Sequence, residues 1–243
     1  MKLEKLDSNT HINTKVLAFT DVTHSFNAHL VHTVPQEFKN IAQHYPIFFA
    51  KNEETGQFSI ITLLGLRINE NLFINEGKWQ GGYLPLNLQT EPFFLIEDEQ
   101  EVDGKLVSKP ALAIDVNNSR VQTTQGEAVF KQGKATTYLQ DKANLLAQFV
   151  EGTRFNNEFI KALLEQNLLE PVNLDITLES GEDISLQGLY TINKEVLVRV
   201  PATAQQEFER LGYVQLMTDI LASLNNVEAL IDLKNKKLKA GKL

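Results

Sequence analysis

The chain has 243 residues, 42% of them hydrophobic and 14 of them Phe, which is enough apolar material for a packed core and excludes disorder of the whole chain. Its formal net charge of -8 would repel a phosphate backbone, so we expect no nucleic acid partner. The absence of cysteine excludes disulfide frameworks, thiolate zinc sites, iron–sulfur ligation and a cysteine nucleophile.

Targeting and membrane signals are not apparent in the sequence. Residues 1–7 are polar and of mixed charge, and they lack the apolar core of a secretory signal. No stretch approaches the roughly 18 to 20 apolar residues that cross a bilayer. We therefore expect a soluble, cytoplasmic protein without a transmembrane segment.

The first half of the chain has the pattern of an antiparallel β region. From residue 15 to about residue 116, short apolar runs alternate with turn clusters. One helix is expected after Pro35, on the apolar spacing that ends at Tyr45, because Pro46 then stops it. A hairpin is predicted around Thr55 and Gly56.

Beyond about Tyr138 the pattern changes to helical spacing. Two apolar stripes are expected to be separated near Gly152, then a hairpin over 172–190, and a further helical region from Pro201 onward. The predicted fold class is α+β, with a β-rich region 1–135 containing one early helix and a helix-rich region 136–243 containing the hairpin. We expect the two regions to form one integrated domain.

The last ten residues carry five lysines and no acid. One interpretation is a solvated, frayed helix end, and the other is a tail that contacts anionic lipid or an acidic partner. An acidic run over 97–103 is expected to be a solvated loop.

The most distinctive residues lie between Tyr45 and Pro85, and further matches extend over most of the chain. They include Tyr45-Pro46-Ile47-Phe48, Leu63-Leu64-Gly65-Leu66, Asn71-Leu72-Phe73, Trp79, Tyr83-Leu84-Pro85, Pro92-Phe93, Ile114-Asp115, Gly188-Leu189-Tyr190 and Leu221-Ala222-Ser223-Leu224-Asn225-Asn226-Val227. In this order they resemble the SapC-like bacterial protein family.

This resemblance implies little about a reaction. Some members of the family are described as surface-layer associated or carry a transport label, and related genes are often seen near flavin-dependent halogenase-like and cupin-like genes. The family pattern usually has Arg-Arg-Tyr before Pro-Phe, whereas this chain has Gln89-Thr90-Glu91. The resemblance therefore implies no arginine contact to an anion at this position of this chain.

All five histidines lie within the first 44 residues, which suggests a metal site that would include His29 and His32 with a carboxylate such as Glu37 or Asp21. No established metal-binding spacing supports it, and structural histidines are the alternative interpretation. Asp115 ends an apolar strand, so it is either a presented carboxylate or an acceptor for the backbone of the following turn.

Trp79 lies between glycines, where an aromatic side chain is free to stack on a partner or to anchor a loop. We therefore predict an accessory protein that binds a peptide or protein through a surface around Tyr45, Trp79, Tyr83 and Asp115, with no cofactor and with a homodimer as one arrangement. The alternatives are a metal-dependent enzyme using the N-terminal histidines, and a surface-layer structural or assembly protein. Catalysis stays open, although the lack of catalytic motifs argues against it.

Overall fold

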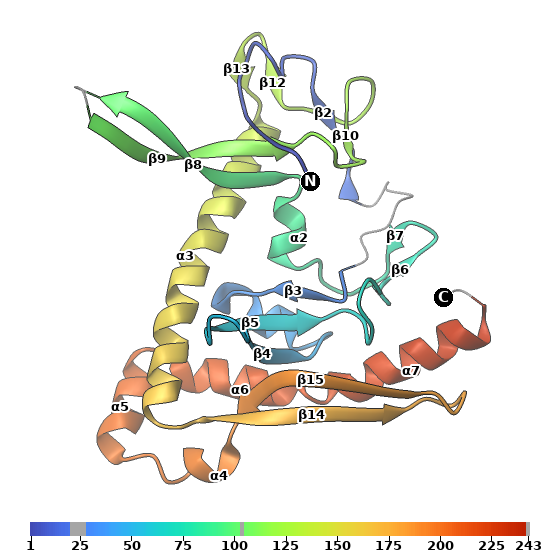
Figure 1. The fold of residues 1–243 in the computed structure, drawn as a ribbon, viewed down its shortest axis with the longest axis vertical. Coiled ribbons are helices and arrows are strands. Elements are labelled where there is room, and N and C mark those ends of the chain that lie inside the picture. Colours follow the sequence, from blue (N-terminus) through green and yellow to red (C-terminus); the bar gives the residue numbers. More distant parts are fainter. Residues whose placement is uncertain (20–27, 103–104, 242–243) are drawn as a thin grey trace. The chain divides into compact units, whose positions relative to one another are not determined.

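A computed structural model describes residues 1–19, 28–102 and 105–241, and the chain divides into two compact units (Figure 1). Unit 1 comprises Met1–Ser25, Glu76–Trp79 and Leu86–Val150, and unit 2 comprises Phe26–Asn75, Gln80–Pro85 and Glu151–Leu243. The fold is α+β with antiparallel sheets, as the sequence predicts. The division between the units does not coincide with residue 135.

Unit 1 contains the longest strand of the described chain, β9. Its strands are β1 (Leu3–Lys5), β2 (Lys15–Val16), β7 (Lys78–Trp79), β8 (Phe93–Val102), β9 (Lys105–Asp115), β10 (Val121–Gln122), β11 (Glu127–Ala128), β12 (Phe130–Lys131) and β13 (Lys134–Ala135). The short helix α2 covers Leu86–Thr90. Sheets form in the orders β1-β9-β8 and β10-β2-β11, and Phe93, Ile114, Val129 and Leu139 form much of the core.

Unit 2 is built on a five-stranded sheet in the order β14-β15-β4-β5-β3. Its strands are β3 (Leu30–His32), β4 (Ile47–Lys51), β5 (Phe58–Leu63), β14 (Leu169–Thr177) and β15 (Asp183–Ile192), and the short β6 (Ile74–Asn75) follows β5. The hairpins predicted around Thr55 and over 172–190 are both present.

The central strand β4 is buried on both faces, which explains its continuous apolar run. Successive side chains of a strand point to opposite faces. Phe48 therefore packs in the cluster that contains Leu230 on one side, and Phe49 meets Phe159 at a centroid distance of 6.3 Å on the other. Helices α6 (Tyr213–Ser223) and α7 (Asn226–Lys239) run across the sheet in Figure 1, in agreement with the first contact.

The helices that follow are α3 (Thr137–Glu165), α4 (Lys194–Leu197), α5 (Ala202–Arg210), α6 (Tyr213–Ser223) and α7 (Asn226–Lys239). The predicted separation near Gly152 is wrong, because α3 continues through this residue. A glycine weakens a helix without ending it, and here a Cβ would lie 2.6 Å from the Cβ of Val34. Gly152 therefore permits close packing within unit 2.

Three further expectations need correction. The early helix is shorter than predicted, with a 3-10 turn at Pro35–Glu37 and α1 at Phe38–Ile41. The acidic run belongs largely to strand β8, where Asp98 lies opposite Lys109 of β9, so cross-strand pairing replaces the expected loop. The lysine-rich end is no frayed tail over its described length, because it forms α7 and buries Lys234 and Lys237.

Candidate functional site

A groove of about 690 Å³ on which a partner could bind lies in unit 2, beside the second half of α3. The helix contributes residues spaced as neighbours on one face, and the other wall is the start of β5. The residues from the helix are Asn157, Ile160, Lys161, Leu164 and Glu165, and those from the strand side are Gly56, Gln57 and Phe58. We call these eight residues the α3–β5 groove.

A tight turn places the strand wall of the α3–β5 groove. The side chain of Asn52 accepts hydrogen bonds from the backbone N–H groups of Glu54 and Thr55, each at 2.9 Å. Gly56 has a φ of 70°, a left-handed conformation that costs glycine little, and its N–H bonds the Asn52 carbonyl at 2.8 Å. The sequence of this turn therefore positions Gln57 and Phe58.

Two neighbouring side chains, Tyr190 and Lys51, hold the ring of Phe58 in place. Its ring packs edge-on against Tyr190 at a centroid distance of 4.9 Å, and the ammonium group of Lys51 lies 5.6 Å from its centroid. Because Tyr190 belongs to β15, a contact across the sheet holds the ring before any ligand arrives. The groove is therefore preorganised on its strand side.

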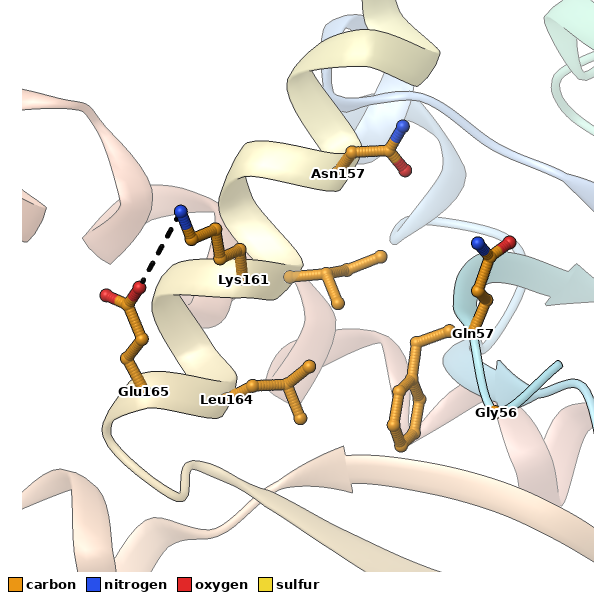
Figure 2. Close-up of a pocket in the computed structure, with 8 residues that line it drawn as sticks. Gly56, Gln57, Asn157, Lys161, Leu164 and Glu165 are labelled. Atoms are coloured by element: carbon orange, nitrogen blue, oxygen red, sulfur yellow. Dashed lines mark ion pairs between the residues drawn. The ribbon is translucent and has the colours of Figure 1, made fainter.

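The helix wall presents apolar and amide groups toward the hollow. Ile160 is 5% exposed and forms part of the floor, whereas Leu164 is 44% exposed. Figure 2 shows Asn157 and Leu164 projecting toward the side that carries Gln57. Lys161 and Glu165 also line the groove and form an ion pair with 4.0 Å between their charged atoms, and in Figure 2 both side chains project away from Gln57.

Two of the sequence-predicted site residues, Tyr45 and Tyr83, come together in unit 2. Tyr45 is fully buried, its hydroxyl donates a 2.5 Å hydrogen bond to the Tyr83 carbonyl, and its ring packs edge-on against Phe73. Beside them, a Cβ on Gly82 would lie 2.3 Å from the His44 ring, so glycine permits this approach. Tyr45 therefore anchors the segment that carries Tyr83 and presents no side-chain surface to a partner.

The other two predicted site residues, Trp79 and Asp115, belong to unit 1. Trp79 is half-buried and packs edge-on against Phe19 at 6.1 Å. The carboxylate of Asp115 accepts hydrogen bonds from the backbone N–H groups of Lys2 at 2.7 Å and Asn117 at 3.2 Å. Asp115 thus has the turn-stabilising contacts that the sequence offered as the alternative to a catalytic role.

The histidines do not form a metal centre within the part of the chain that the structure describes. His29 lies at a bend directly before β3, and His32 is the last residue of that strand. Glu37 is buried and accepts a 2.9 Å hydrogen bond from the Thr33 hydroxyl. Over these residues no three side chains of His, Asp or Glu gather in a way that could hold a metal, while His24 and Asp21 lie outside the described residues.

Unit 1 contains a cluster of buried charged groups that the sequence did not reveal. Arg120 is 4% exposed, donates to the carbonyls of Leu17 and Glu91 at 2.9 Å each, and lies over the Phe19 ring. Lys142 donates to the Gln89 carbonyl at 2.5 Å. The backbone of residues 89–91 is therefore bound by two cations.

Burial dominates the titration of this cluster. It raises the pKa of the Glu91 carboxyl to about 7, although nearby Arg120 acts in the opposite direction and Asp115 adds to the rise. Burial likewise raises the pKa of the Tyr138 hydroxyl and lowers that of Lys142. Glu91 can therefore take up and release a proton near neutral pH.

The α3–β5 groove itself was missed by sequence reasoning, although a signal was present. Leu163 and Leu164 stand next to each other in the second predicted apolar stripe, yet adjacent residues of a helix point about 100° apart. Leu163 is fully buried and Leu164 is half-exposed, so only the first faces the core. When the apolar residues of a helix extend beyond the face that packs on the core, the additional ones can indicate a second contact surface.

Comparisons with known proteins identify a family for this chain. Residues 6–230 match the family model described as SapC. No curated protein and no solved structure matches the chain. Within the described residues, no helix combines the length and the apolar character that a bilayer crossing requires.

Proposed function

The chain belongs to the SapC family, and we propose that it is a binding or accessory protein that recognises a peptide segment of a partner protein in the α3–β5 groove. The observation that carries the proposal is the pairing of a preset aromatic wall at Phe58 with the half-exposed Leu164 across the groove. Ligand sites are commonly concave and mostly apolar, with a few polar groups that orient the ligand.

The chemistry of the walls favours a peptide over other ligands. Large apolar side chains of a partner fit between Phe58 and Leu164, where they would leave water. The amides of Gln57 and Asn157 each offer a donor and an acceptor at the rim, which matches the alternating N–H and C=O groups of an extended peptide.

Selection from displayed random linear peptides, followed by fluorescence anisotropy, tests this function. We expect selected peptides to carry large apolar residues and to lose affinity about tenfold or more with Leu164→Glu, because the new carboxylate would have to lie against apolar groups. Val150→Glu is the matched control, since Val150 is 43% exposed on the same helix but does not line the groove.

The control should keep wild-type affinity within about twofold, a change smaller than about 0.5 kcal/mol. The proposal fails if no peptide is enriched over a selection without protein. It also fails if both variants weaken binding equally, because the loss would then not come from the groove. Circular dichroism of both variants checks that the fold is retained.

The cytoplasmic location expected from the sequence is part of this proposal. The protein can bind a partner peptide in the cytoplasm only if the protein itself resides in the cytoplasm. Fractionation of host cells with an antibody against the chain tests the location. Recovery of the protein in a cell-surface fraction would contradict it.

A further inference from the structure

The outer strand β14 of the main sheet in unit 2 is paired on one side only among the described residues (Figure 1). It is nine residues long, whereas the strand at the other edge, β3, has three. The register between β14 and β15 shifts once, and the extra residue lies in β15, where Gly188 has a φ of 75°. β14 itself is therefore a regular strand with a long open edge.

Two hydrogen bonds show which backbone groups of β14 point to this open edge. The Leu168 carbonyl accepts from the N–H of Asn193 at 2.8 Å, and the N–H of Leu178 donates to the Glu182 carbonyl at 2.8 Å. Both bonds lie on the β15 side, because Asn193 and Glu182 flank that strand. Successive residues of an antiparallel strand direct their backbone groups to alternate sides. The even-numbered residues of β14 therefore bond β15, and the odd-numbered residues face outward.

The outward backbone groups are unused within the described part of the chain. Pro171 has no N–H, and no hydrogen bond between described residues reaches the outward N–H groups of Leu169, Asn173, Asp175 and Thr177. A row of such groups is a template for a further strand, and proteins often block it with lysines or with a bulge in the edge strand. β14 contains no basic residue, and the bulge lies in its inner neighbour.

The sequence of β14 is compatible with an identical strand that runs antiparallel to it. A two-fold axis through the central residue, Asn173, overlaps the whole strand and places outward-bonding residues opposite one another. Each copy then contributes one residue to each of four pairs, Leu169 with Thr177, Glu170 with Ile176, Pro171 with Asp175 and Val172 with Leu174.

This register avoids repulsion and covers apolar groups. Glu170 and Asp175 are the acidic residues of β14, and each lies opposite an uncharged residue, whereas an axis through either would place like charges together. Val172 and Leu174 are partly buried against the main core cluster, and each would cover the other in the second copy. The two acids lie on opposite faces of the strand, so they form no charged stripe for a basic peptide.

We propose that β14 is a dimerisation edge, through which two copies of the chain pair antiparallel about Asn173 and continue one sheet into the other. A strand of nine residues is about 30 Å long, and its edge alone covers less than the roughly 800 Å² per partner of a standard interface. The dimer is therefore weak, with a Kd of about 10 to 100 µM. No residue of β14 lines the α3–β5 groove, so the dimer is independent of the proposed function.

Charges placed on the two-fold axis test the register, with sedimentation equilibrium at a series of protein concentrations as the measurement. Asn173→Lys and Asn173→Asp should each raise the Kd about fivefold or more, because each new charge meets its own copy. An equimolar mixture of the two variants should restore association, since Lys then lies opposite Asp. Ser185→Lys is the matched control and should leave the Kd unchanged, because exposed Ser185 pairs with Asp175 inside the sheet.

A cross-link tests the same contact directly, because the chain has no cysteine of its own. Directly opposite residues of a hydrogen-bonded pair have Cα atoms about 5.5 Å apart, a separation that a disulfide can span. Asn173→Cys should therefore form a disulfide-linked dimer under mild oxidation. Ser185→Cys, one strand further in, should stay a monomer under the same conditions.

Three results would overturn the proposal: a wild-type chain that stays monomeric, a dimer that neither charged variant weakens, and a mixture that does not restore association. Peptides that shift the β14 amides of a monomeric chain would also overturn it, because the edge would then bind another protein. Circular dichroism checks that each variant is folded. Peptide binding in the α3–β5 groove should survive Asn173→Lys, so the dimer and the proposed function can fail separately.

Discussion

The carboxyl group of Glu91 shows at the scale of one residue how burial sets behaviour in unit 1. Its pKa is raised to about 7 chiefly by burial, and the neighbouring charges of Arg120 and Asp115 act in opposite directions. An unfolded chain would lose this proton near pH 4.5. Between these two pH values the folded state therefore binds more protons than the unfolded state. The contribution of Glu91 to the free energy of unfolding falls as the pH rises through this range.

We predict that the free energy of unfolding contributed by Glu91 falls by about 2 kcal/mol as pH rises from about 4.5 to about 7. Glu91→Gln removes the titration while keeping the size of the side chain. The variant should match the wild type near pH 4.5 and be more stable by about that amount near pH 8. Urea denaturation at a series of pH values measures both proteins.

The difference between the two proteins is the informative quantity, because other groups also titrate. Burial lowers the pKa of His29, for instance, so its contribution to stability rises with pH through the same range. A stability difference between Glu91→Gln and the wild type that does not vary with pH would show that Glu91 has an ordinary pKa.

Residue roles could be predicted from sequence only where local contacts decide them. The turn after Asp115 supplies the N–H of Asn117, two residues away, and such a contact follows from residue type and spacing. The partner of Tyr45 is the carbonyl of Tyr83, which lies far along the chain. A hydrogen bond between distant residues leaves no local pattern in the sequence, so the burial of Tyr45 could not be predicted.

Helix α3 is the element on which both the fold of unit 2 and its groove depend. Phe155 and Phe159 pack against Tyr213 at centroid distances of 5.6 Å and 4.9 Å, while Asn157 and Leu164 face the groove. Gly152 lets the same helix approach the turn that precedes α1. One helix thus joins the core to the proposed binding surface.

We predict that Gly152→Ala destabilises the protein by about 1 to 3 kcal/mol, because the new Cβ would lie 2.6 Å from the Cβ of Val34. Val34 is fully buried and cannot move freely. A glycine without such a neighbour would show the reverse, since alanine is favoured in helices by about 1 kcal/mol. Thermal unfolding followed by circular dichroism measures the change.

Asn144→Ala is the matched control for this prediction, since Asn144 is exposed on the same helix. It should stabilise the protein slightly, by up to about 0.5 kcal/mol. If Gly152→Ala also stabilised the protein, the close approach between α3 and Val34 would be contradicted.

The existence and type of most elements followed from periodicity, whereas their ends did not. Alternation around Ser180 and Gly181 predicted the β14–β15 hairpin, because turn residues and strand pattern agree there. The end of α1 and the continuity of α3 depend on tertiary packing. At Gly152 that packing prevails over the low helix propensity of glycine.

At the scale of the whole molecule, the main sheet joins distant parts of the chain. Strand β15 pairs with β4 at Leu189 and Ala50, so the two halves of the sequence form one sheet. The core of unit 2 likewise combines Phe48 and Ile61 with Ile184 and Leu230. Sequence periodicity predicted the strands themselves. It gave no information on this pairing, because the pattern within one segment does not show which distant strand lies beside it or in which register.

We predict that a fragment of residues 136–243 does not fold alone. It would retain β14, β15 and the later helices but would lack β4 and β5, which form the middle of the sheet. Its apolar residues would have lost half of their partners in the core. We expect a non-cooperative thermal transition and narrow amide dispersion.

A nicked protein is the control for the fragment. A protease site inserted in the turn at Gly133, between β12 and β13, allows cleavage after folding while all strands stay present. The nicked complex should melt cooperatively. A cooperative melt of the isolated fragment would contradict the shared sheet.

Chemical-shift mapping of a selected peptide on the labelled full chain tests the central claim most directly. The proposal of a peptide-binding α3–β5 groove predicts amide shifts concentrated at Gln57, Phe58, Ile160 and Leu164, and their disappearance with Leu164→Glu. Shifts confined to the surroundings of Tyr83, Trp79 or Asp115, with none in the groove, would contradict it.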